Sequence, residues 1–142
     1  MDSLPACAEV LQSAAGLPAT LDAAHRAFAT LLAVLRHHQE DDETAFPAFV
    51  LAANAAANGR DWIADAPSLP ASCSLPAGHA DLLPDADIAE VAAQVTAVSC
   101  QLVRRLAALA AAAADPGDRS ACLRAAGQAS AICDLLGGAA CR

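Results

Sequence analysis

The chain has 142 residues, a formal net charge of -8 and 56% hydrophobic residues, which suits a single domain with its own core. Alanine, the best helix former, accounts for 41 residues and aromatic residues for only 3%, so the composition predicts an all-α fold. Eight arginines and no lysine provide no basic cluster, and no apolar stretch runs uninterrupted for a membrane span. We therefore expect no nucleic-acid partner and no membrane.

The first third of the chain predicts two helices. Ser3 is a suitable N-cap for a helix over about residues 5–15, which Gly16 ends. A second helix begins near Pro18, and its apolar residues recur at three- and four-residue spacing past Pro47. Because proline lacks a backbone N–H, Pro47 should kink or break this helix, and we expect a bend near residues 45–47.

A Pro-rich segment follows, over about residues 58–85. Its four prolines exclude a long helix, so we interpret it as an ordered crossover between the second and third helices. Trp62 and Ile63 are its expected anchors to the rest of the domain. Long connections of this kind in compact domains are either functional or mobile.

The last third of the chain predicts two more helices. The third begins at Asp85 or Asp87, carries an apolar stripe, and stops at the breaker over residues 115–117. The fourth runs from about residue 118 to the glycine pair at 137–138. Together the four elements predict an antiparallel four-helix bundle, with residues 1–142 as one domain.

The start of the chain and its cysteines both bear on the expected cellular location. The second residue is acidic, Asp2, where a secretory signal needs basic residues, so we expect a cytoplasmic protein. Its six cysteines show no C-x-x-C pair, and we expect reduced thiols that act mainly as small packing residues.

One segment, residues 35–47, departs from this helical background. Two histidines, His37 and His38, are followed after one residue by four consecutive acids. If the helix continues through the run, Asp42 lies about 40° from the centre of its buried face and His38 about 80°. His37 then faces solvent, and His25 lies on the opposite flank. A buried carboxylate needs a metal, a cation or a strong hydrogen-bond donor, so Asp42 is the main chemical clue.

The pattern His-His-x-x-acid-acid-x-x-x-Phe-Pro over residues 37–47, after a leucine-rich run, resembles the second helix of hemerythrin-like (HHE cation-binding) domains. The resemblance implies a four-helix bundle that binds iron, as a di-iron or a mononuclear centre, for oxygen or redox sensing or for metal handling. It implies His38 and Asp42 as the principal metal ligands. The further candidate ligands are His37, Asp41, His25 and His79. The other helices lack the histidines of that family, so the implied ligand set is incomplete and the chain a divergent member.

Other interpretations remain open. The first is a metal-free helical bundle that binds a small molecule or serves as a partner or accessory protein, for example as a homodimer. In this case one of the adjacent residues Arg104 and Arg105 must point near the core or a partner surface, and it could neutralise Asp42. The second is an enzyme or binding protein of a specialised pathway, with Trp62 in a lid. In the third, thiolates such as Cys122 and Cys133 replace imidazoles as ligands, which favours Cu(I) or zinc. No phosphate loop or hydrolase motif is present to favour a particular enzyme.

Overall fold

The computed structural model of the chain describes residues 3–71 and 87–137. These residues form helices and no strand, which confirms the predicted all-α fold. The helices are α1 (Leu4–Ser13), α2 (Leu17–His38), α3 (Phe46–Ala64), α4 (Ile88–Ala112) and α5 (Pro116–Leu136).

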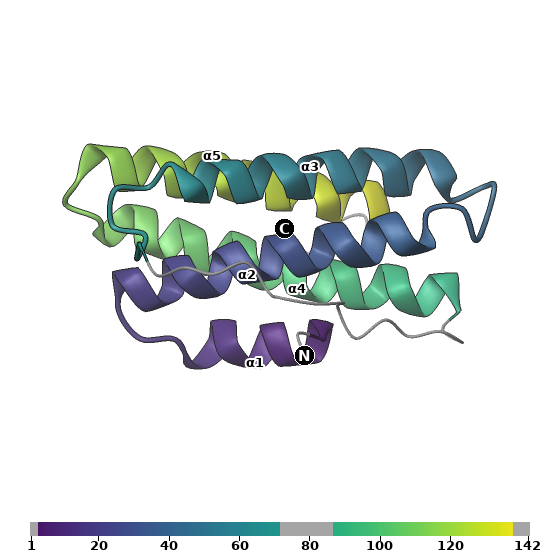
Figure 1. Ribbon diagram of the computed structural model, residues 1–142, viewed down its shortest axis with the longest axis horizontal. Helices are drawn as coiled ribbons and strands as arrows, with labels where there is room; N and C mark the ends of the chain where they lie inside the picture. Colours follow the sequence, from purple (N-terminus) through teal and green to yellow (C-terminus); the bar gives the residue numbers. More distant parts are fainter. Residues whose placement is uncertain (1–2, 72–86, 138–142) are drawn as a thin grey trace.

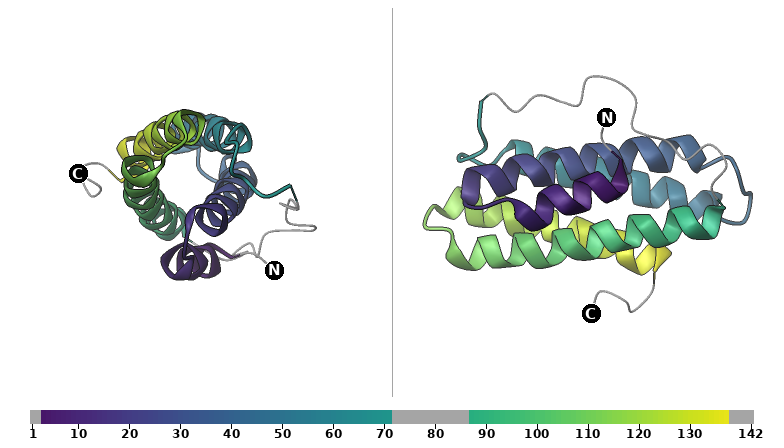
Figure 2. Two further views of the ribbon diagram at one scale, coloured as in Figure 1. Left: turned by 90° about the vertical axis from the view of Figure 1, so that its left-hand side faces the viewer. Right: turned by 90° about the horizontal axis from the view of Figure 1, so that it is seen from below.

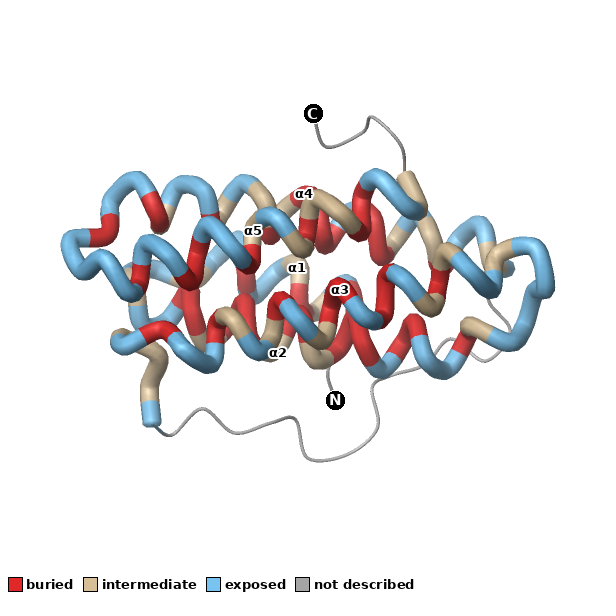
Figure 3. Tube along the Cα trace, turned by 90° about the horizontal axis from the view of Figure 1, so that it is seen from above, coloured by how far each residue is buried: buried red, intermediate tan, exposed pale blue. Residues whose placement is uncertain are grey.

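The helices lie side by side with roughly aligned axes (Figure 1, Figure 2). Helix α2 packs on α3, α3 packs on α5, and α5 packs on α4. The short α1 contacts both α2 and α4 and so covers the seam between them. Buried positions recur along each helix (Figure 3), and the largest fully buried side chains include Phe28, Phe49 and Leu102. The periodic apolar stripes of the sequence therefore form one continuous core.

Side-chain caps fix three of the helix starts. The Ser3 hydroxyl accepts a hydrogen bond from the Ala6 amide, as the sequence predicts. Asp87 caps α4 through the Ala89 amide. Asp115 accepts the amide of Gly117, so the predicted breaker is itself the start of α5. Each cap satisfies an amide that has no partner inside its helix.

The predicted second helix is two helices, because the chain breaks before Pro47 instead of bending there. Helix α2 ends at His38, and α3 begins at Phe46, with Pro47 in its first turn, where the missing N–H costs nothing. Between them the Asp42 carboxylate accepts the amides of Thr44 (2.8 Å) and Ala45 (3.3 Å). This turn reverses the chain at the right-hand end of Figure 1.

The crossover is consequently displaced by one helix. It follows the third helix of the chain rather than the second, and residues 58–64, assigned to it from the sequence, belong to α3. Ile63 is fully buried, as expected of an anchor. Trp62 lies within α3 with the guanidinium of Arg124 4.4 Å from its ring centre. Because Trp62 is part of a packed helix, its assignment to a lid is wrong, while residues 72–85 of the predicted crossover lie outside the described residues.

Helix α4 is the one described helix whose length and composition would let it cross a membrane. Its most apolar window has a mean hydropathy of 1.3, and 44% of that window is buried inside the structure. Since the core helix of a folded domain has the same composition, this observation does not favour a membrane location.

Candidate functional site

The predicted metal segment lies at the end of α2 and in the turn that follows. His38 is 3% exposed, and its Nδ1 lies 2.7 Å from Oδ2 of Asp41, which is exposed. Nε2 of His38 is buried and has no hydrogen-bond partner among the described residues. The structure therefore brings two of the predicted ligands, His38 and Asp41, into contact. The imidazole of His38 points inward, and the carboxylate of Asp41 is exposed.

The inward orientation predicted for Asp42 is wrong. Its side chain is exposed and is used to cap the turn before α3. With Glu40, Glu43 and Phe46 it lines a pocket of about 270 Å³. The prediction failed because it assumed that the helix continued past His38, whereas the chain leaves the helix there.

The remaining predicted ligands are not brought together. His37 is exposed, and its ring meets that of His38 edge-on with 4.8 Å between the centroids. His25 is buried in the same helix, about 20 Å from His38 along the axis. Burial lowers the pKa of His25, and the positive charge of Arg60 lowers it further. His79 lies outside the described residues.

These positions do not fit the di-iron centre that the resemblance implies. No group of three or more His, Cys, Asp or Glu side chains within residues 3–71 and 87–137 is arranged to hold a metal ion. Of the two principal ligands predicted, the His38 side chain is buried and the Asp42 side chain is exposed to solvent.

The described cysteines are buried. Cys7, Cys122 and Cys133 carry reduced thiols, which agrees with the prediction of reduced packing residues, whereas Cys100 is disulfide-bonded. Burial raises the pKa of Cys122 to about 11 and also raises that of Cys133. Because metals bind the thiolate, a raised thiol pKa opposes metal binding, which weakens the thiolate interpretation at these two positions.

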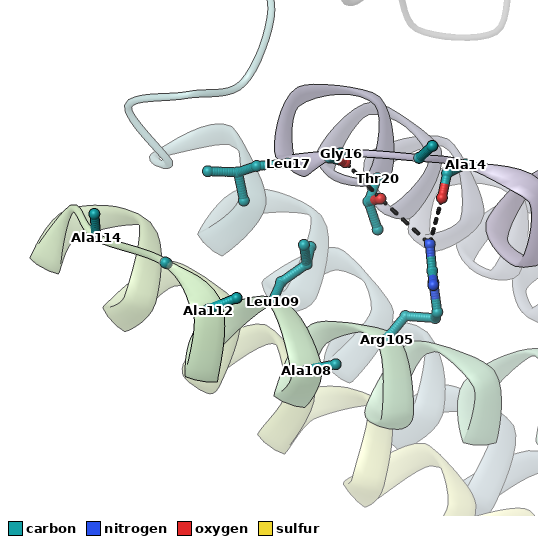
Figure 4. A pocket seen from close by; sticks show the side chains of 11 residues that line it. Ala14, Gly16, Leu17, Thr20, Arg105, Ala108, Leu109, Ala112 and Ala114 are labelled. Atoms are coloured by element: carbon teal, nitrogen blue, oxygen red, sulfur yellow. Dashed lines mark hydrogen bonds between the residues drawn. The ribbon is translucent and has the colours of Figure 1, made fainter.

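A different pocket lies at the other end of the molecule, where α1 turns into α2 and α4 ends (Figure 4). Its volume is about 530 Å³, within the range of small-molecule sites. Apart from Arg105, Thr20 and Gly16, the lining residues are alanines and two leucines. On α4 it is lined by Arg105, Ala108, Leu109 and Ala112, which share one helical face.

Arg105 is the polar feature of this pocket. Its Nη2 donates to the Ala14 carbonyl (2.5 Å) and, at 3.4 Å, to the hydroxyl of Thr20. Its Nε is buried and has no hydrogen-bond partner among the described residues. None of the ion pairs in the described part of the chain involves Arg105, although the sequence has sixteen acidic residues against eight arginines.

The sequence drew attention to Arg104 and Arg105, and half of that expectation is confirmed. Arg104 is exposed while Arg105 is half-buried, so one of the pair does point inward. The suggested partner was wrong, because Asp42 lies at the α2–α3 turn, at the opposite end of α2 (Figure 1). The available signal was the spacing of Arg105, Ala108 and Ala112, a charge followed by small residues on one face.

No family model, curated protein or solved structure matches this chain.

Proposed function

We propose that the chain is a helical bundle, with α2 to α5 in antiparallel order and α1 added to one seam, that binds a small molecule in the Arg105 pocket. One observation carries the proposal. Arg105 places a guanidinium with no acidic partner among the described residues at the wall of an otherwise apolar pocket of about 530 Å³. Apolar walls with a few fixed polar groups are typical of ligand sites.

The pocket is built so that a ligand could be held from two sides. The α1–α2 turn provides Ala14, Gly16 and Leu17, and the last turns of α4 provide Ala108 and Ala112. Arg105 spans the two sides through its bond to Ala14. Small side chains on α4 leave the space open, because larger ones at the same positions would fill it.

The test is ligand-observed NMR with a mixture of short alkyl alcohols, carboxylates and amines. We expect members of the mixture to bind the wild type and to bind Ala108→Phe at least about tenfold more weakly, because the new ring occupies the pocket. Ala108 is exposed, so the substitution does not disturb the core.

The matched control is Ala107→Phe. Ala107 is the preceding residue of α4, is also exposed, and does not line the pocket. This variant is expected to bind like the wild type. The proposal is wrong if no compound binds the wild type, or if both variants bind as well as it does.

A second candidate is the metal-binding function that the hemerythrin resemblance implies, reduced to a single ion at His38. The observation that favours it is the buried Nε2 of His38 without a described partner, while Asp41 holds Nδ1. A carboxylate that orients a ligand imidazole in this way is common in metal sites. Under this candidate, wild-type protein from iron-supplemented cells carries about one metal ion per chain. The His38→Ala variant should lose the metal, and the His37→Ala variant should retain it. Metal below about 0.2 per wild-type chain would exclude it.

A further inference from the structure

The shape and charge of the Arg105 pocket identify a class of ligand. We propose that it binds a free monocarboxylate with a linear alkyl chain of about eight carbons, with the carboxylate at Arg105 and the chain along α4. This inference rests on the proposed function, because it specifies the ligand of the same pocket.

The charge of the ligand follows from what surrounds Arg105. A half-buried guanidinium favours an anion, and within the described residues none of the ion pairs supplies one. Nη2 donates to one carbonyl and one hydroxyl, and Nε is buried with no partner among the described residues. A planar carboxylate matches the fork of a guanidinium, which an alcohol or an amine does not.

The ligand is expected to carry a single negative charge. Arg105 is the only cationic side chain among the residues that line the pocket. The pocket lies where α1 and α4 end and where α2 begins at Leu17, so the helix dipoles there oppose one another and add no support for a second negative charge, such as that of a phosphate monoester. One carboxylate balances the one guanidinium.

The alkyl chain follows from the rest of the wall. From Arg105 toward the end of α4 its face continues as Ala108, Leu109 and Ala112, to the left in Figure 4, and Leu17 lies opposite. None of these side chains can form a hydrogen bond. The distance along α4 from Arg105 to Ala112 is about 10 Å, comparable to an extended eight-carbon chain. Each methylene placed on this wall is removed from water, which favours a linear tail.

Calorimetric titration with three probes of equal chain length tests the inference. The probes are octanoate, 1-octanol and octylammonium, and the proteins are the wild type, Arg105→Gln and Arg105→Lys. We expect the wild type to bind octanoate at least about tenfold more tightly than octanol, and octylammonium more weakly than either. Arg105→Gln should remove the preference for octanoate while octanol binding persists. Arg105→Lys should retain only part of it, because lysine lacks the fork.

Binding of octanol by Arg105→Gln also shows that the pocket remains intact without the bond to Ala14. If octanol and octanoate bind the wild type equally, or if Arg105→Gln leaves the preference unchanged, the carboxylate inference is wrong while the proposed pocket stands. If none of the three probes binds the wild type, or if Ala108→Phe binds them all as the wild type does, the pocket itself is wrong.

Discussion

Gly59→Ala is expected to lower the free energy of unfolding by about 2–3 kcal/mol, because the added methyl group would overlap a buried ring. Gly59 lies in α3 against α2, and a Cβ built on it meets the ring atoms of Phe28 closer than real contacts allow. Phe28 is fully buried, so its ring has no free space into which to move. Urea denaturation of the variant and the wild type measures the difference as a shift in midpoint.

Gly127→Ala is the matched control for this prediction. Gly127 also lies inside a helix, α5, but nothing lies within 4 Å of the Cβ that alanine would add. There we expect stabilisation by about 0.5–1 kcal/mol, since alanine is the better helix former. Adding Phe28→Leu to Gly59→Ala should recover part of the loss. Equal stability of Gly59→Ala and the wild type would contradict the close packing of α3 on α2.

Asp118→Ala is expected to destabilise the chain by about 2–3 kcal/mol, because it leaves part-buried donors without their acceptor. Asp118 is 1% exposed and lies in the first turn of α5. Its carboxylate accepts the Ser68 amide at 2.9 Å and the Ser68 hydroxyl at 2.5 Å. These bonds tie the segment after α3 to the start of α5, fifty residues later. Thermal unfolding of the variant measures the loss.

A double-mutant cycle with Ser68→Ala separates this contact from a general effect of the substitution. Ser68→Ala removes only the hydroxyl, so its own effect should be smaller than that of Asp118→Ala. The double variant should be less destabilised than the sum of the single variants, since the lost bond is counted in both. Simple additivity would show that Asp118 does not act through the Ser68 hydroxyl.

The helical content was predictable because local chemistry determines it. Alanine content, apolar spacing and the caps at Ser3 and Asp115 act over a few residues and are readable without a structure. The division between α2 and α3 was missed because it depends on a turn in which the Asp42 carboxylate accepts the backbone amide of Thr44. With that turn assigned as helix, Pro47 could be explained only as a bend.

The assignment of this turn as helix also explains most of what was wrong in the predicted metal site. Angles around a helix axis have meaning only while the helix continues, and α2 ends at His38. His37 precedes this end and is exposed, as predicted. Asp42 follows it and is also exposed, although an inward orientation was predicted for it. The burial and contacts of His38 and the partner of Arg105 depend on packing between helices, which a single sequence does not display.

The Arg105 pocket could not be assembled from the sequence. Its two walls, around Gly16 and around Ala108, lie about ninety residues apart in the chain and meet only because α1 folds into the seam beside α4. Alanines on an exposed helix face are unremarkable in a chain that has 41 of them. The isolated positive charge of Arg105 distinguishes this face from the others.

The most direct measurement of small-molecule binding at this site is an alanine-methyl NMR titration of the folded chain with octanoate. The account predicts saturable shifts of the Ala108 and Ala112 methyl signals, which line the pocket, while Ala125 and Ala129 in the buried face of α5 stay in place. Saturable shifts that spare Ala108 and Ala112 and appear elsewhere, or no shifts at all, would contradict it.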